Sequence, residues 1–242
     1  MKPLSPHDGV FVLTGAGVSA ESGLPTFRGA DGLWRGRRVE EVATPQAFHA
    51  NPELVWQFYS ERRKRHASVA PNDAHRALAD LEQSLGERLF LCTQNVDSLH
   101  EQAGSKRVAH MHGRLMQTRC SRETCRTPPF DDERLYLTRG DIPTCPKCGA
   151  MLRPHICWFG ETPFGMDRIF EELRVCTLLL TVGSSGVVEP AASFVRMARM
   201  NYARAVYIGP EEPANAEFFD EVVLGKAGEV LPKLVKELSP AA

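Results

Sequence analysis

The stretch G-V-F-V-L-T-G-A-G-V-S-A-E-S-G at residues 9–23 decides the fold of this chain. Gly9 to Thr14 is short, apolar and β-branched, which is typical of a buried strand. The glycine-rich residues Gly15 to Gly23 follow directly and open a short helix. Strand, glycine turn and helix start together form the entry to a dinucleotide-binding βα unit, although the spacing is not the standard G-x-G-x-x-G. A tight βα turn without a ligand is the alternative.

Two further strands are predicted to end in polar or small residues. The strand Arg88 to Thr93 delivers Gln94, Asn95 and Asp97, and the strand Leu178 to Val182 ends in Gly183-Ser184-Ser185. In open α/β sheets, ligands bind at the carboxyl ends of the strands. Asn and Asp also favour plain turns, so a capping loop is the alternative for residues 94–97.

Cys120, Cys125, Cys145 and Cys148 form a C-x4-C…C-x2-C pattern. Paired thiols at these spacings are typical of a tetrahedral zinc site, in which the metal fixes a small ribbon with little apolar surface. Four unrelated buried thiols, or disulfides, are the alternatives. The chain has seven cysteines, an odd number, and residues 1–8 do not resemble a secretory signal. We therefore expect reduced thiols, one structural Zn²⁺ and a cytoplasmic location.

Helices are predicted from Asn51 to about His66, from Asp73 to Leu85, from Ala191 to Asn201 and from Gly228 to Leu238, and a strand at Ala205 to Ile208. Together these elements predict an α/β protein. We expect a Rossmann-like parallel-sheet domain at residues 1–115 and 154–242, with a helical insertion at about 35–75 and an inserted zinc-ribbon module at 116–153.

The composition is that of a globular protein. Of the 242 residues, 43% are hydrophobic and 24% charged, with a net charge of −1, so no global field attracts nucleic acid. The longest apolar runs are too short to span a bilayer. We expect neither nucleic acid nor membrane as a partner, and the sequence does not specify an oligomeric state.

His112 precedes Gly113 and lies between the Gln-Asn-Asp loop and the cysteines. Histidine exchanges protons near neutral pH, so His112 is a candidate general base. The full order is G-A-G-V-S-A-E-S-G-L-P-T-F-R-G at 15–29, T-Q-N-V-D-S-L-H at 93–100, His112-Gly113, the four cysteines, and Gly183-Ser184-Ser185. This order resembles that of the sirtuins, NAD-dependent protein lysine deacylases, over about residues 9–238.

The resemblance implies a reaction and a set of residues. Sirtuins cleave the nicotinamide–ribose bond of NAD and transfer the acyl group of lysine to the ribose, releasing nicotinamide and O-acyl-ADP-ribose. His112 would be the catalytic base. Trp158, Phe159, Gly160 and Glu161, after the segment 152–155, would bind the acyl-lysine protein or peptide as an added strand. The NAD-binding residues would be Gly15, Ala16, Gly17, Ser19, Ala20, Thr26, Phe27, Arg28, Trp34, Gln94, Asn95, Asp97, Gly183, Ser184, Ser185, Gly209 and Ala227.

Tyr59 and Arg62 lie three apart, on one face of the predicted helix. A phenol and a guanidinium together can hold a carboxylate. The pair is similar to that of sirtuins that prefer succinyl-, malonyl- or glutaryl-lysine, and Thr26 stands where many sirtuins have an acidic residue. Arg63, Lys64 and Arg65 are expected to form a solvated basic face, and Arg62 as a surface arginine is the alternative.

Some features depart from the family pattern, and other functions are conceivable. Gly209-Pro210 stands where sirtuins often have an asparagine for the adenosine ribose, which predicts weaker NAD binding. The alternatives are a plain NAD-dependent deacetylase, a protein mono-ADP-ribosyltransferase, a Rossmann oxidoreductase and a zinc-ribbon protein that binds nucleic acid. Asp131, Asp132 and Glu133 near the thiols disfavour the last.

Overall fold

The computed structural model describes residues 3–26, 33–34 and 37–238, with only the backbone described at 33, 34, 37 and 39. The chain forms two compact units. The sheet unit comprises residues 1–26, 70–111 and 165–242. The ribbon unit comprises residues 27–69 and 112–164. Each unit is therefore assembled from segments that are distant in the sequence.

The sheet unit is built on six parallel strands in the order β11-β10-β9-β1-β4-β5. This is the doubly wound strand order of the Rossmann fold. The strands are β1 (Val10–Thr14), β4 (Leu89–Thr93), β5 (Val108–His110), β9 (Leu178–Val182), β10 (Arg204–Gly209) and β11 (Glu221–Leu224). The helices of this unit are α1 (Gly17–Ala20), α5 (Asp73–Leu85), α6 (Leu99–Gln102), α7 (Met166–Val175), α8 (Phe194–Met200) and α9 (Ala227–Leu238).

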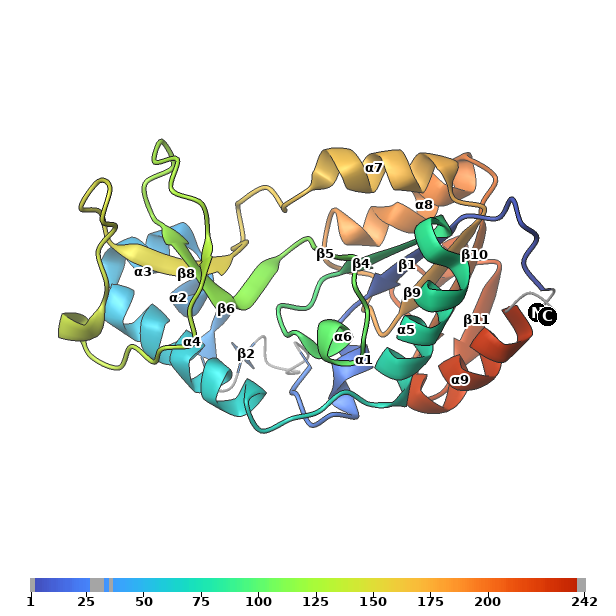
Figure 1. Ribbon diagram of the computed structural model, residues 1–242, viewed down its shortest axis with the longest axis horizontal. Helices are drawn as coiled ribbons and strands as arrows, with labels where there is room; N and C mark the ends of the chain where they lie inside the picture. Colours follow the sequence, from blue (N-terminus) through green and yellow to red (C-terminus); the bar gives the residue numbers. More distant parts are fainter. Residues whose placement is uncertain (1–2, 27–32, 35–36, 239–242) are drawn as a thin grey trace. The chain divides into compact units, whose positions relative to one another are not determined.

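The sheet is buried on both faces, as Figure 1 shows for the helices that cover it. In β1, Val10 and Val12 point to the core under α5 and α9, whereas Phe11 and Leu13 point to the core under α7 and α8. Successive side chains of a strand alternate between faces, so a strand covered on both sides must be apolar throughout. This explains why residues 10–13 contain no polar side chain.

The ribbon unit carries a three-stranded antiparallel sheet in the order β7-β6-β8. Its strands are β6 (Gly113–Cys120), β7 (Phe130–Asp131) and β8 (Leu152–Ile156), and a separate pair is formed by β2 (Leu33–Trp34) and β3 (Arg37–Arg38). Its helices are α2 (Val39–Val42), α3 (Pro45–Ala50) and α4 (Pro52–His66). Asn51 caps α4 by accepting from the Leu54 amide at 3.0 Å, and Pro52 opens the helix, as its sequence predicts.

Most predicted elements are confirmed, including the parallel α/β fold, α4, α5 and the strands that became β1, β4 and β9. The helix expected at 191–201 begins as a 3₁₀ turn at Ala191–Ser193 and continues as α8. Helices α2 to α4 group with the ribbon unit. The domain boundaries of the sequence analysis stay a prediction. Along the described residues, no helix combines the length and apolar character needed to cross a bilayer.

Candidate functional site

The loops after β1 and β9 meet where the strand order reverses. The Gly17 amide donates to the Gly183 carbonyl at 2.9 Å. A Cβ at Gly17 would lie 2.7 Å from the Gly183 Cα, and Gly183 itself has φ +62. Only glycine fits such a close backbone approach. The glycines thus join the two loops at the edge where doubly wound sheets bind ligands.

Ser19, Asn95 and Asp97 form a buried polar cluster at this edge. The Ser19 hydroxyl donates to Asp97 Oδ2 at 3.1 Å and accepts from Asn95 Nδ2 at 3.1 Å. The Asn95 amide also donates to the Gly15 carbonyl at 3.2 Å. All three side chains are at least 92% buried, so these hydrogen bonds fix their orientation. The structure therefore brings predicted residues from two loops into one network.

Gln94 ties the loop after β4 to the loop after β9. Its Nε2 donates to the Ser184 hydroxyl at 2.9 Å, and its backbone amide donates to the Thr14 carbonyl at 2.9 Å. The carboxyl ends of three adjacent strands, β9, β1 and β4, are thereby linked through side chains and backbone.

Two buried histidines that the sequence analysis missed lie beneath this cluster. His75 Nε2 is 3.4 Å from the Ser19 hydroxyl, and His100 Nε2 is 3.0 Å from Thr14 Oγ1. Their rings meet edge to face at 4.8 Å. Burial lowers the pKa of His75 to about 4 and that of His100 to about 3, so both are neutral at pH 7. The Asn72 cap beside His75 marked the start of α5, but nothing local marked the ring as buried.

The remaining predicted cofactor residues belong to both units. Gly209 ends β10 and Ala227 opens α9, both buried, while Ala16, Thr26 and Ser185 are half-buried and Ala20 is exposed. Phe27 and Arg28 lie outside the described residues. Trp34 is described by its backbone alone, in β2.

In the ribbon unit, His112 is half-buried and immediately precedes β6. Its carbonyl accepts from the Cys157 amide at 2.9 Å. Gly113 has φ +86, and a Cβ there would lie within 2.1 Å of the His155 carbonyl oxygen. Glycine is therefore required after His112, because only glycine adopts this conformation with the carbonyl so close.

The four cysteines converge on one point. Cys120, Cys125, Cys145 and Cys148 place their sulfurs within 4.8 Å of one another. The Sγ–Sγ distances are 3.5 Å for Cys120–Cys148 and 3.8 Å for Cys125–Cys145. A tetrahedron with metal–sulfur bonds of about 2.3 Å has edges of about 3.8 Å. The four cysteines are thus positioned to bind one metal ion, and a set of four thiolates is that of structural zinc, with no open position for water.

Tyr59 and Arg62 lie together on α4, as predicted. The Arg62 guanidinium carbon lies 5.7 Å from the Phe58 ring centroid and 5.9 Å from that of Tyr59. Tyr59 is fully buried, and its hydroxyl accepts from Trp158 Nε1 at 2.9 Å. Burial raises the pKa of Tyr59 to about 12, against the opposing charge of Arg62, so the hydroxyl stays protonated at neutral pH.

The predicted peptide-binding loop, residues 158–161, is held by an ion pair. The buried Arg153 donates to Glu161 Oε1 at 2.6 Å and to Oε2 at 2.9 Å, and its guanidinium carbon lies 3.3 Å from the Trp158 ring centroid. Glu161 also accepts from the Trp158 amide at 2.8 Å. The Glu161 carboxylate thus closes the loop on itself, while Phe159 remains 46% exposed.

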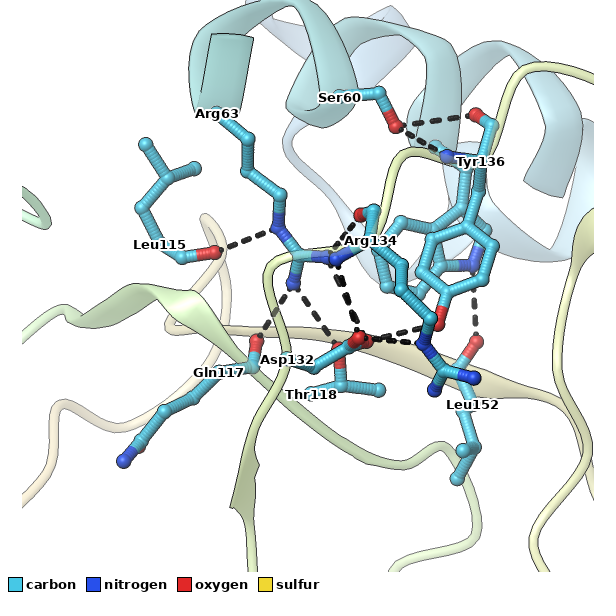
Figure 2. Close-up of polar contacts among 10 residues, drawn as sticks. Ser60, Arg63, Leu115, Gln117, Thr118, Asp132, Arg134, Tyr136 and Leu152 are labelled. Atoms are coloured by element: carbon cyan, nitrogen blue, oxygen red, sulfur yellow. Dashed lines mark hydrogen bonds and ion pairs between the residues drawn. The ribbon is translucent and has the colours of Figure 1, made fainter. Parts of the chain in front are cut away.

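The expectation of a solvated basic face at residues 63–65 is wrong for Arg63. Lys64 and Arg65 are exposed, but Arg63 is only 1% exposed and pairs with the buried Asp132 at 3.5 Å (Figure 2). A charge run in the sequence does not reveal a partner some 70 residues away. Local sequence therefore gave no indication of this pair.

Comparisons with known proteins agree with this geometry. The model of the "Sir2 family" matches residues 15–190. An NAD-dependent protein deacylase of Pasteurella multocida is 48% identical, covering 92% of this chain and 94% of that protein. One of Yersinia pseudotuberculosis is 46% identical, covering 94% and 81%. A solved structure of a Sir2 homologue–NAD complex is 42% identical, with a TM-score of 0.85 over 96% of this chain and 90% of that one.

Proposed function

This chain belongs to the Sir2 family, and we propose that it is an NAD-dependent protein lysine deacylase that removes succinyl and malonyl groups as well as acetyl groups. NAD would supply the ribose that accepts the acyl group, so that nicotinamide and O-acyl-ADP-ribose are released. The observation that carries the proposal is the pairing of Tyr59 with Arg62 on α4, in a chain that otherwise carries the family's NAD-binding motifs.

The sheet unit would hold NAD. The joined loops at Gly15–Gly17 and Gly183–Ser185 lie at the edge of the sheet where doubly wound folds bind dinucleotides. Ser19, Asn95 and Asp97, already locked by mutual hydrogen bonds, would hold the ribose and the nicotinamide end. Such preorganisation lowers the entropy lost on binding. Ala16, Ala20, Thr26, Phe27, Arg28, Trp34, Gln94, Gly209 and Ala227 would complete the contacts.

His112 would act as the general base. Gly113, which follows it, has φ +86 and no room for a Cβ, so the backbone beside His112 is fixed. It would accept a proton from a ribose hydroxyl, and that oxygen would then capture the acyl carbon. The metal would take no part in this chemistry, because four thiolates fill its coordination sphere.

Tyr59 and Arg62 would bind the carboxylate at the end of a succinyl or malonyl chain. The Tyr59 hydroxyl accepts from Trp158, which leaves its own proton to donate to a carboxylate oxygen. Arg62 would supply the positive charge that offsets the desolvation of that carboxylate. Acetyl-lysine carries no carboxylate and would gain nothing from either group.

Residues 158–161 would bind the acyl-lysine peptide. The Arg153–Glu161 pair holds this loop in shape, and the exposed Phe159 gives it an apolar surface. Trp158 links α4 to the loop at residues 158–161. Its indole donates to the Tyr59 hydroxyl, and its backbone amide donates to the Glu161 carboxylate. The partners would be acyl-lysine proteins, and we propose a cytoplasmic location.

A panel of acetyl-, propionyl-, malonyl-, succinyl- and glutaryl-lysine peptides, with and without NAD, tests the proposal. We expect NAD-dependent release of nicotinamide with the succinyl, malonyl and acetyl peptides. Turnover of acetyl-lysine alone would reduce the protein to a plain deacetylase. Transfer of ADP-ribose to protein without loss of the acyl group would identify it as a mono-ADP-ribosyltransferase.

A further inference from the structure

Helix α4 is attached to the ribbon unit through one face. Trp56, Ser60 and Arg63 are spaced four and three residues apart, so they point the same way. Trp56 Nε1 donates to the Leu152 carbonyl at 3.0 Å. The Ser60 hydroxyl donates to the Tyr136 carbonyl at 3.1 Å and accepts from the Tyr136 amide at 2.8 Å. The side chains of this face therefore bind the backbone of the ribbon (Figure 2).

The Arg63 guanidinium is the most heavily bonded group on this face. Its partners are three carbonyl oxygens, a hydroxyl and a carboxylate, one for each of the five N–H groups of an arginine. These partners are the carbonyls of Leu115, Arg134 and Gln117 at 2.9, 2.7 and 3.3 Å, Thr118 Oγ1 at 3.0 Å and Asp132 Oδ2 at 3.5 Å. A shorter or more flexible cation could satisfy only part of this set.

Asp132 is held in turn by the same ribbon. Its carboxylate accepts from Thr118 Oγ1 at 2.6 Å, from the Tyr136 hydroxyl at 2.8 Å and from Arg134 Nε at 2.8 Å. A buried ion pair with all partners satisfied fixes geometry more than it adds stability. Arg63 and Asp132 are therefore placed to set where α4 lies on β6.

The residues that α4 presents next to this face are Tyr59 and Arg62. Tyr59 is fully buried against Trp158, so it follows any movement of the helix. Recognition of a carboxylate by a phenol and a guanidinium needs placement within about 0.5 Å. Acetyl-lysine presents no carboxylate, so it is insensitive to that placement.

We propose that Arg63 is a positioning residue for acyl selection: by fixing α4 on the ribbon, it holds Tyr59 and Arg62 where they bind a substrate carboxylate. This inference rests on the proposed function of Tyr59 and Arg62. The metal site also helps to hold α4 on the ribbon unit. Cys120 ends β6 and pairs with Leu152 of β8, and the Leu152 carbonyl accepts from Trp56 of α4.

Arg63→Lys tests the inference, because it keeps the charge opposite Asp132 but loses the planar five-donor fork. Arg65→Lys, the same change at an exposed position of α4, is the matched control. We expect Arg63→Lys to retain its zinc and to lower kcat/KM for succinyl-lysine about tenfold, through a higher KM. Its kcat/KM for acetyl-lysine should change less than about twofold. Arg65→Lys should change neither value.

Equal losses for the two substrates in Arg63→Lys would overturn the inference, because Arg63 would then only support the fold. If Arg63→Lys does not fold, Ser60→Ala loosens the same face and should shift the succinyl-to-acetyl ratio in the same direction; an unchanged ratio there also overturns it.

A combined variant separates this inference from the proposed function. In a background that carries both Tyr59→Phe and Arg62→Met, Arg63→Lys should cause no further loss of succinyl preference, because its effect passes through those two residues. A further loss would contradict the inference and leave the proposed function intact. If Arg62→Met alone left the ratio unchanged, the proposed function would fail and Arg63 would have no acyl site to position.

Discussion

The sheet unit and the ribbon unit bury different chemistry at their centres. The sheet unit packs two apolar cores against its strands, with Val12 on one side and Phe11 on the other. The ribbon unit also buries apolar side chains, such as Trp158, but it adds the buried Arg63–Asp132 pair and four gathered thiols. The ribbon unit therefore relies on polar and metal-binding groups in addition to apolar burial. Different changes, such as loss of a thiol or a lower pH, should therefore destabilise the two units.

Removal of one thiol should have the largest effect. Cys145→Ser should lose the metal and unfold the ribbon, since zinc binding contributes on the order of 10 kcal/mol to folding in small zinc modules. Metal analysis with hydrogen exchange measures both effects. Amides of β6 and β8 should lose protection while those of β1 and β9 keep it. Replacement of Cys92, outside the cluster, is the control and should leave the zinc in place. Full metal content in Cys145→Ser would contradict the four-thiol site.

Loss of His112 should affect catalysis without affecting stability. His112→Ala removes the proposed base, which typically costs about 10²–10⁴ in rate. NAD binding should persist, because most of the residues proposed to hold NAD lie in the sheet unit and His112 is not among them. Single-turnover deacylation and the Kd for NAD measure the two properties separately. Turnover within about threefold of wild type would show that another group moves the proton.

Acid should weaken the sheet unit before it weakens the Arg63–Asp132 pair. His75 and His100 have folded pKa values of about 4 and 3, below about 6.5 in the unfolded chain, so the unfolded chain binds more protons. Their stabilisation is present above the unfolded pKa of about 6.5 and is lost as the pH falls toward 4 for His75 and toward 3 for His100. At pH 5 the loss is about 1–2 kcal/mol for each histidine.

Asp132 titrates in a lower range. Burial alone would raise its pKa, but hydrogen bonds from Arg134, Thr118 and Tyr136 outweigh burial and lower the pKa to about 2. Its contribution is present above pH 4 and is lost only as the pH falls toward 2.

Urea unfolding at pH 7 and pH 5 measures the effect of the two histidines on stability, and His100→Gln should reduce that effect by about half. An unchanged pH dependence in that variant would contradict the role of His100.

The sequence could predict those features of the two units that depend on local patterns. The strands β1, β4 and β9 follow from continuous apolar runs that end in glycine or amide residues, and α4 follows from its Asn-Pro cap. Those patterns are local. The four cysteines were also found, because thiol pairs at short spacing are informative in themselves.

The polar contacts of the ribbon could not be predicted in this way. Arg63 stands in a basic run that is typical of solvent, and its burial depends on Asp132 and on carbonyls some 50–70 residues away. Glu161 was expected to contact substrate, yet both of its oxygens bind Arg153. His75 and His100 likewise become a pair only when α5 and α6 meet.

The proposed acyl site, Tyr59 and Arg62, lies on α4 of the ribbon unit, and one measurement tests it most directly. This is the ratio of kcat/KM for succinyl-lysine to that for acetyl-lysine, in wild type and in Arg62→Met. We predict that Arg62→Met lowers the succinyl value by about 1–3 kcal/mol in transition-state terms and leaves the acetyl value almost unchanged. Tyr59→Phe should act in the same direction but less strongly, because it removes only a neutral donor. If both substrates lost activity equally in Arg62→Met, the arginine would serve the fold, and the protein would be a plain deacetylase.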